Sequence, residues 1–384
     1  MATTYDCIVL GVGGFGSSTV YHLAKRGVKV LGIEQHSIAH DLGSSHGDTR
    51  VIRKAYFEHP NYVPLLDQAY ECWDELQQEF ADYNKTDPNK LLWDQCGLLS
   101  CGPSDGMAIR GTREAIALHQ LPCDELSLKE CAKRFPGFRV PDNFVALFEP
   151  EAGYLFVEKC VEAHCRLAQE HGAVIKTNES VLDWQANNRG VEVTTANAVY
   201  QADRLVLTAG AWSAQVLKDL SLPLTIRRKT LFWHGTTDAS FNVDGPGSTF
   251  LFEMPYGVFY GFPSLDGATL KLAEHTGGEV VDDPDQIERL VNSNDEAPIQ
   301  RFVSEVMPSL HRSASRHCVC MYTMTPDENF IIDQHPLHQN VTLAAGFSGH
   351  GFKFTASIGE SLADLAMDGG TRMPIDFLGL SRLQ

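Results

Sequence analysis

The stretch YDCIVLGVGGFGSSTVYHLAKRGVKVLGIEQH, residues 5–36, decides which fold this chain can adopt. Its apolar run at residues 8–10 predicts a strand, residues 17–26 have the pattern of a helix, and residues 28–33 predict a second strand. A GxGxxG motif lies between the first strand and the helix. In this strand–helix–strand frame the motif predicts a dinucleotide-binding site, and the alternative is a glycine-rich turn that serves packing alone.

The three glycines and the acidic residue of this unit each have a separate physical task. Gly11 permits the tight turn, Gly13 lets a pyrophosphate approach the backbone, and Gly16 lets the helix pack closely on the strand. The N-terminus of the helix offers free N–H groups and the positive end of the helix dipole to phosphates. Glu34 can accept hydrogen bonds from an adenosine ribose, which disfavours NADP and leaves FAD and NAD open.

The composition limits the classes of protein to which this chain can belong. Its 384 residues favour two domains or one large domain with an inserted layer, and 43% hydrophobic residues predict a well-buried interior. A formal net charge of −18 argues against nucleic acid and anionic membrane surfaces as partners. Because no secretory signal pattern and no membrane-spanning apolar run are present, we expect a cytoplasmic protein.

The ten cysteines are scattered without regular spacing, so we expect most of them to be reduced and buried. They form no zinc-type cluster with histidines, and no metal site is predicted. Cys318 and Cys320 would lie on one face of a strand, about 6.6 Å apart at roughly 3.3 Å per residue, which is the far edge of disulfide reach. By spacing alone, both are predicted to be buried structural cysteines.

Two kinds of pattern alternate along the chain. Residues 151–220 and the C-terminal part combine amphipathic helices with buried strands, whereas residues 228–275 have the pattern of antiparallel strands. We therefore predict an α/β fold in which a Rossmann-like, dinucleotide-binding domain is interleaved with a domain built on an antiparallel β-sheet. The predicted segments are 1–85, 151–220 and 316–384 for the first domain and 86–150 and 221–315 for the second.

Two stretches place cations where a hydrophobic core would not need them. Arg50 and Arg53 are three residues apart and would share one side of a helical turn, which suits a phosphate or a carboxylate. Lys271 and His275 would point to the same face of a strand and line one surface. The alternatives are a solvated basic face for the arginines and the wet side of a sheet for the second pair.

A second glycine loop, residues 346–351, follows a predicted buried strand and opens a helix. Its glycines, Gly346, Gly349 and Gly351, could form another backbone cradle. Aimed at the N1–C2 carbonyl region of a flavin, the helix N-terminus and Lys353 would stabilise the reduced anionic ring. The alternative is an ordinary strand–helix turn with a surface lysine.

Several of these stretches belong to longer motifs that occur together in one family. They are GSSHGDTRVIRKAY (43–56), FYGFP (259–263), LKLAEH (270–275), CMYTMTPDENFIID (320–333), AAGFSGHGFKF (344–354) and the closing LSRLQ (380–384). In these motifs the chain resembles, over nearly its whole length, the monomeric sarcosine oxidase family of flavin-dependent amine oxidases. The family includes sarcosine, N-methyltryptophan and pipecolate oxidases. The resemblance implies FAD as the cofactor and a FAD-binding domain interleaved with an antiparallel catalytic sheet.

The resemblance also implies roles for individual residues. Cys320 would carry the FAD through a thioether, and Cys318 would have no such role. Arg53 and Lys353 would bind the substrate carboxylate, and Arg50 would lie close to the flavin ring. The remaining catalytic positions are Tyr260 and Tyr322 in the pocket wall, His275 near the substrate amine and Lys271 over the flavin, where oxygen reacts. Further cofactor contacts are expected from Ser44, Ser45, Thr49, Val181, Gly210 and Trp212.

The implied activity is oxidation of a secondary, N-methyl amino acid to an imine, with O₂ reduced to H₂O₂, by a monomeric enzyme. Sarcosine would give glycine and formaldehyde. Ser45 stands where sarcosine-type members have a histidine, Lys54 is typical of pipecolate-type members, and Leu251 replaces a pocket methionine.

These departures keep several alternatives open. N-methyl-L-tryptophan or L-pipecolate could be the substrate, and a related dehydrogenase would use an acceptor other than O₂. A non-enzymatic module that binds NAD is disfavoured by the second glycine loop and the Cys-Met-Tyr motif.

Overall fold

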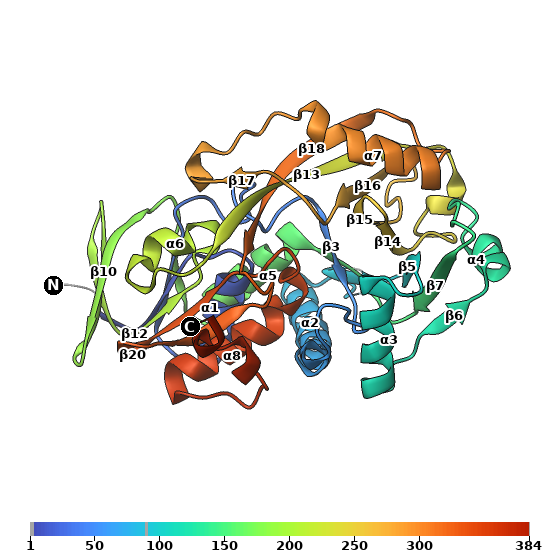
Figure 1. Ribbon diagram of the computed structural model, residues 1–384. Coiled ribbons are helices and arrows are strands. Elements are labelled where there is room, and N and C mark those ends of the chain that lie inside the picture. The colour runs from blue at the N-terminus through green and yellow to red at the C-terminus, as the bar shows by residue number, and fades with distance from the viewer. Residues whose placement is uncertain (1–3, 89–90, 384) are drawn as a thin grey trace.

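The computed structural model describes residues 4–88 and 91–383, and its strands form three sheets flanked by helices (Figure 1). The mixture of parallel and antiparallel sheets confirms the predicted α/β fold class. Within the described ranges, none of the helices is both long and apolar enough to cross a membrane.

Within the described residues, eight strands form the first sheet: β1 (Thr4–Leu10), β2 (Val30–Ile33), β9 (Val174–Lys176), β10 (Val181–Asn187), β11 (Gly190–Thr195), β12 (Val199–Leu207), β19 (Ile331–His335) and β20 (His338–Ala345). Its centre is parallel, because β1 pairs with β2 and β12, β2 pairs with β9, and β12 pairs with β20. Antiparallel pairs extend this centre at β10–β11–β12 and at β19–β20.

Four helices pack together beside this sheet: α1 (Gly14–Lys25), α2 (Val63–Asn84), α5 (Val157–Glu170) and α8 (Thr355–Asp368). Helices α2 and α8 are seen in the lower part of Figure 1. Alternation along β1 places Cys7 and Val9 in the core shared with these helices, and Ile8 and Leu10 in a separate core on the opposite face. A central strand buried on both faces explains why residues 8–10 are continuously apolar.

The second sheet contains nine strands of the described residues: β5 (Leu98–Pro103), β6 (Asp124–Leu126), β7 (Phe144–Glu149), β13 (Thr225–Gly235), β14 (Thr249–Met254), β15 (Gly257–Gly261), β16 (Thr269–Glu274), β17 (Val280–Val281) and β18 (Ala314–Met324). It is antiparallel except between β5 and β14. The remaining helices are α3 (Met107–His119), α4 (Leu128–Arg134), α6 (Ser213–Val216) and α7 (Ser293–Val306). Stacking of Phe259 on Phe302, with ring centroids 4.6 Å apart, fixes α7 on this sheet.

The longest pairing in this sheet joins β13 to β18, from Thr225 opposite Met324 to His234 opposite Ala314. The predicted division into domains assigns residues 316–324 to the FAD-binding part, whereas this pairing makes them a strand of the second sheet. The division itself stays a prediction.

A third, three-stranded sheet contains β3 (Thr49–Ile52), β4 (Trp93–Gln95) and β8 (Gly153–Phe156). Arg50 lies on β3, where it pairs with Leu155 of β8, and Arg53 directly follows this strand. The predicted helical turn for the two arginines is therefore wrong, because β8, about a hundred residues further along the chain, supplies strand partners that the local sequence does not reveal.

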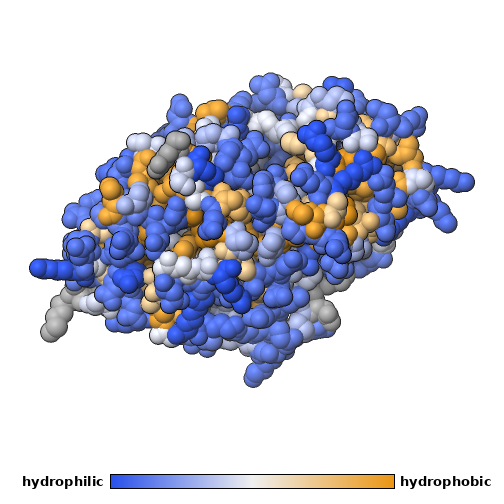
Figure 2. All heavy atoms as spheres, turned by 60° about the horizontal axis from the view of Figure 1, so that its bottom comes forward, coloured by the Kyte–Doolittle hydropathy of each residue, from blue (hydrophilic) through white to orange (hydrophobic). Residues whose placement is uncertain are grey.

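The face of the molecule seen in Figure 2 is largely hydrophilic, with apolar side chains interspersed among polar ones. This mixture is typical of the surface of a globular protein, where apolar atoms also contribute much of the exposed area.

Replacing Gly16 by alanine tests the contact that joins α1 to the β1 turn. The added Cβ would lie 1.8 Å from the carbonyl oxygen of Gly11 and 2.7 Å from Thr208 Oγ1. We expect Gly16→Ala to lower the free energy of unfolding by at least about 2 kcal/mol in urea denaturation. Gly370→Ala is the control, because its Cβ would have no neighbour within 4 Å. Equal stability of the two variants would contradict the close approach.

Candidate active site

A long cavity runs between the first and second sheets. One end is lined by the β1–α1 turn and by Glu34 at the end of β2. The other end is lined by the segment after β3, by β14 and β15, and by the second glycine loop with Lys353. The cavity therefore joins the predicted nucleotide site to the predicted cation cluster.

Glu34 fixes the nucleotide end of the cavity. Its carboxylate accepts hydrogen bonds from the backbone N–H of Val12 at 2.8 Å and of His36 at 3.0 Å. Burial raises the pKa of Glu34, but hydrogen bonds from His40 and these two amides outweigh burial and leave this pKa below its ordinary value. An ionised carboxylate at this position can accept hydrogen bonds from ribose hydroxyls.

The glycines of the β1–α1 turn leave room for a phosphate group. Gly11 has a φ of +84°, a conformation that favours glycine. A Cβ on Gly13 would meet Ser45 Oγ at 3.8 Å and otherwise open space, so a ligand can approach this backbone closely. Together with the N-terminus of α1, the turn fits the pyrophosphate of a dinucleotide such as FAD.

Arg50 occupies the middle of the cavity wall. Its guanidinium donates hydrogen bonds to the carbonyl oxygens of Thr49 and Ser44, each at 2.9 Å, and contacts Cys320 Sγ at 3.5 Å. Ser44 in turn donates its hydroxyl to the carbonyl oxygen of Met321 at 2.7 Å. The contacts tie the segment before β3 to β18 and keep a positive charge at the wall.

Lys271 lies behind this wall rather than on it. Its ammonium donates hydrogen bonds to the carbonyl oxygen of Gly47, to the carbonyl oxygen of Thr49 at 2.7 Å and to Thr49 Oγ1 at 3.3 Å. Burial, and then the neighbouring charge of Arg50, lower the pKa of Lys271 well below its ordinary value.

Arg53 and Glu58 form a buried ion pair at the far end of the cavity. Arg53 Nη2 donates to the two carboxylate oxygens of Glu58 at 2.8 and 2.6 Å. The guanidinium carbon lies 4.4 Å from the ring centroid of Tyr56 and 4.5 Å from that of Phe57. Burial raises the pKa of Glu58, but the charge of Arg53 outweighs burial and lowers this pKa to about 2. Arg53 is held rigidly at the cavity surface.

Lys353 adds a second cation beside Arg53. It lies in the 3₁₀ helix η6 (Phe352–Phe354), and its ammonium donates to the carbonyl oxygen of His350 at 2.7 Å and to the Tyr56 hydroxyl at 3.5 Å. Burial, and then Arg53, lower the pKa of Lys353 to about 7. The two cations and Glu58 line the same corner of the cavity.

Tyr260, His275 and Tyr322 form an aromatic wall next to this corner. The ring centroids of His275 and Tyr322 are 5.7 Å apart, and those of Tyr260 and His275 are 6.3 Å apart. Burial lowers the pKa of His275 to about 3 and raises the pKa of both phenols. All three side chains are therefore uncharged near neutral pH.

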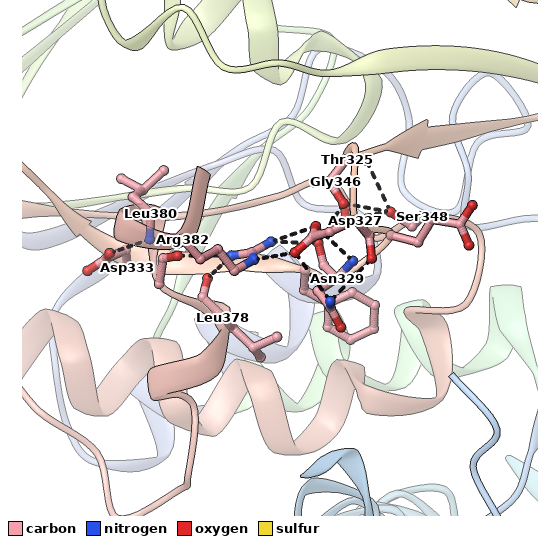
Figure 3. Close-up of polar contacts among 12 residues, drawn as sticks. Thr325, Asp327, Asn329, Asp333, Gly346, Ser348, Leu378, Leu380 and Arg382 are labelled. Atoms are coloured by element: carbon pink, nitrogen blue, oxygen red, sulfur yellow. Dashed lines mark hydrogen bonds and ion pairs between the residues drawn. The ribbon is translucent and has the colours of Figure 1, made fainter. Parts of the chain in front are cut away.

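The C-terminal segment supports the second glycine loop through a chain of polar contacts (Figure 3). Arg382 pairs with Asp327 at 2.9 Å and donates to the carbonyl oxygen of Asn329 at 2.8 Å. The Thr325 hydroxyl donates to the same oxygen at 2.7 Å, and the Thr325 N–H donates to Ser348 Oγ within the loop at 3.2 Å. The loop that carries the cradle is thus tied to the end of the described chain.

Cys318 and Cys320 have different surroundings on β18. Cys320 is 1% exposed and contacts the carbonyl oxygen of Ser44 at 3.6 Å. Cys318 is only half-buried, so the prediction of two buried cysteines is wrong for this residue, and its Sγ lies 3.9 Å from His46 Nδ1. Burial raises the pKa of the Cys318 thiol to about 11. Both thiols are free.

Most of the predicted site residues lie on the cavity wall. Those that do not are Gly16, Thr49, Lys271 and Cys320. Gly16 packs against Gly11 of the wall, Thr49 and Cys320 contact Arg50, and Lys271 is one residue further away, hydrogen-bonded to Thr49. Sequence reasoning missed Glu58, Phe57 and His350, which also line the cavity. These three residues could have been found from their position in the sequence, because each lies within five residues of Arg53 or Lys353. The roles of the predicted residues stay predictions.

The sequence profile of the FAD-dependent oxidoreductase family matches residues 6–365 of this chain. The chain therefore belongs to this family of enzymes, and the cavity described above fits its cofactor. It is 41% identical to monomeric sarcosine oxidase from Bacillus sp. (strain B-0618), with 100% of this chain and 97% of that protein aligned. It is 34% identical to N-methyl-L-tryptophan oxidase from Yersinia pestis (strain Pestoides F), with 99% and 100% aligned. Within the family, the chain groups with these oxidases.

Solved structures show the same fold. NikD, described as an unusual amino acid oxidase, matches with a TM-score of 0.84 and 22% identity over 98% of this chain and 97% of that chain. Glycine oxidase from Geobacillus kaustophilus matches with a TM-score of 0.83 and 17% identity over 99% of each chain.

Glu58→Gln tests the ion pair with Arg53. Removing one partner leaves a buried charge without compensation, so we expect a loss of about 3 kcal/mol in the free energy of unfolding at pH 7. Because the folded-state pKa of Glu58 is lowered to about 2, its contribution exists above the unfolded pKa near 4.5 and disappears as the pH falls toward 2.

Urea denaturation of the wild type and of Glu58→Gln between pH 2.5 and 7 measures how much their free energies of unfolding differ. Asp67→Asn is the control, because Asp67 pairs with Lys54 from a side chain that is 55% exposed. We expect this control to change stability by less than about 0.5 kcal/mol. A Glu58→Gln effect that does not shrink in acid would contradict the assignment.

Proposed function

We propose that this enzyme oxidises the carbon–nitrogen bond of a secondary amino acid, with FAD as cofactor and O₂ as electron acceptor. With sarcosine as substrate, water and O₂ are consumed, and glycine, formaldehyde and H₂O₂ are formed. The names of the most similar relatives support sarcosine or another N-methyl amino acid.

The observation that carries the proposal is the pairing of two buried cations with an uncharged aromatic wall. Arg53 and Lys353 are 4% and 6% exposed, and both line the same end of the cavity. This corner suits a carboxylate, which would receive charge-assisted hydrogen bonds from two directions. A carboxylate fixed in this corner would place the adjacent amine and its C–H bond beside the aromatic wall.

The chain's own residues would prepare the amine for oxidation. An ammonium has no lone pair, so the bound substrate must lose a proton before it reacts. The nearby cations favour that loss by like-charge repulsion, and the uncharged His275 does not oppose it. Bound FAD supplies the two-electron acceptor for the C–H hydrogen. The resemblance implies Lys271 for the reaction with oxygen and places Arg50 close to the flavin ring. Both residues donate a hydrogen bond to the carbonyl oxygen of Thr49.

The proposal also covers the size of the substrate and the identity of the electron acceptor. Phe57 and Leu251 give the cavity an apolar wall near Arg53, which suits an N-alkyl group or a ring. N-methyl-L-tryptophan and L-pipecolate are therefore alternative substrates, and an acceptor other than O₂ is the alternative chemistry. Relatives named as monomeric support a monomer, and we propose a cytoplasmic location.

A peroxide assay tests this function directly. Purified yellow holoenzyme is offered sarcosine, N-methyl-L-tryptophan, L-pipecolate and L-proline in air, and H₂O₂ is measured. We expect Lys353→Met to lower kcat/KM about a hundredfold, because a charge-assisted hydrogen bond to the carboxylate is lost. Lys54→Met is the control, since Lys54 pairs with Asp67 and Glu151 outside this corner. Absence of peroxide with all four amino acids would refute the oxidase.

Covalent attachment of FAD through Cys320 is a separate proposal. Its support is the position of Cys320 beside Ser44 and Arg50 of the cavity wall. We expect acid-precipitated wild type to stay yellow and Cys320→Ser to release its colour. Cys318→Ser is the matched control and should stay yellow. Release of the flavin from the wild type would disprove the attachment.

A further inference from the structure

We propose that Lys229 is a positioning residue for the amine-binding end of the cavity. In this role, its ammonium holds the turn that carries His275 and places an additional positive charge behind that imidazole. The inference rests on the proposed function and deepens it, because it names a residue outside the cavity wall that controls ionisation of the substrate amine.

Lys229 is built into the turn that follows β16. It lies on β13 opposite Cys320 of β18, is 4% exposed, and donates a hydrogen bond from its ammonium to the carbonyl oxygen of Thr276. A Cβ on Gly278 would lie 2.9 Å from the Lys229 Cδ. The turn at residues 275–278 therefore wraps closely around the lysine side chain.

The ammonium lies next to Tyr322 of the aromatic wall. Lys229 Nζ is 5.6 Å from the centroid of the Tyr322 ring, which is in turn 5.7 Å from the centroid of His275. Lys229 itself does not line the cavity. It therefore acts on a bound amine through its charge and through the position of His275, without touching the substrate.

Two carboxylates, Glu274 and Asp295, are among the charged groups around Lys229, but burial outweighs them and keeps the pKa of its ammonium below the ordinary value. The titratable and charged groups that face it are Arg227 and Arg228 on β13, Glu274 and His275 at the end of β16, Cys320 and Tyr322 on β18, and Asp295 on α7. Asp295 is engaged by Arg228 at 2.6 Å, and Glu274 accepts the Thr276 hydroxyl at 3.0 Å. The groups that face His275 from elsewhere are Glu58, His350 and Lys353.

The charge of Lys229 depends on pH within the working range of an enzyme. Burial lowers its pKa to about 8, so the ammonium is present below about pH 8 and lost above it. Below that pH its charge favours the neutral form of a nearby amine. A residue that only filled space would have the same effect at every pH.

Anaerobic stopped-flow reduction of the holoenzyme by saturating sarcosine, between pH 6 and 10, tests this role. We expect Lys229→Met to be about tenfold slower than wild type near pH 6.5, which corresponds to a shift of about one unit in the amine pKa. The two rates should converge above about pH 9. If sarcosine is not the preferred amino acid, the best substrate from the peroxide assay replaces it.

Two further variants separate charge from hydrogen bonding. Lys229→Gln keeps a donor for Thr276 without the charge, serves if the methionine variant does not fold, and should also be slow only at low pH. Arg227→Met is the matched control, because Arg227 donates to Gly278 of the same turn from a more exposed position. Its rate should equal that of the wild type near pH 6.5, where Lys229 is charged in both proteins.

Binding of methoxyacetate provides a readout that needs no turnover. This ligand has the shape of sarcosine with an ether oxygen in place of the amine, and its Kd can be followed by the flavin spectrum. We expect Lys229→Met to change this Kd less than threefold at every pH, because the carboxylate corner is intact.

The outcomes separate this inference from the proposed function. Reduction slowed equally at all pH values, a profile that overlays the wild type, or a parallel loss of methoxyacetate binding would overturn the role of Lys229 alone. A wild-type enzyme that no secondary amino acid reduces would overturn the proposed function and this inference with it.

Discussion

An excess of buried positive charge is the constraint on which the rest of the site depends. The chain has a formal net charge of −18, yet Arg53, Lys229, Lys271 and Lys353 are each between 4% and 6% exposed. Glu58 is paired with one of them, whereas the three lysines donate mainly to backbone carbonyl oxygens. Carbonyl dipoles compensate a buried ammonium less well than a carboxylate does, and burial holds the pKa of each lysine below its ordinary value. A bound anion relieves this imbalance.

The fold produces this concentration of charge by bringing separate elements together. Arg53 follows β3 of the small sheet, Lys229 and Lys271 lie on β13 and β16 of the second sheet, and Lys353 opens the segment leading to α8. The hydrogen bonds from Lys229 to Thr276 and from Lys271 to Thr49 join distant parts of the chain and form only when the strands have assembled. Arg53 and Lys353 are held locally instead, by Glu58 and by the carbonyl oxygen of His350. The cavity between the sheets is consequently the place where distant parts of the chain meet.

The sequence predicted those parts of the structure that depend on local pattern. The strand–helix–strand unit, the second glycine loop and the strand that carries Cys320 all followed from residues within a short window. Arg50 and Arg53 were placed on a helical turn because their spacing fits one, whereas the pairing of β3 with β8 depends on residues about a hundred positions away. Lys229 gave no signal at all, since its partner Thr276 becomes a neighbour only through sheet pairing. The pairing of strands that are distant in sequence therefore determines the surroundings of these residues, which the local pattern does not reveal.

The ionisation of Lys353 connects carboxylate binding to amine chemistry. Burial and then Arg53 lower its pKa to about 7, so near pH 8 most of the ligand-free lysine is uncharged. A carboxylate bound beside it raises this pKa and restores the ammonium. The substrate amine must meanwhile release a proton under the influence of the same cations. Because one group gains the proton that the other loses, a zwitterionic amino acid can bind near pH 8 with little net proton exchange. The bound carboxylate restores the positive charge of Lys353, and this charge favours the neutral amine that the proposed oxidation requires.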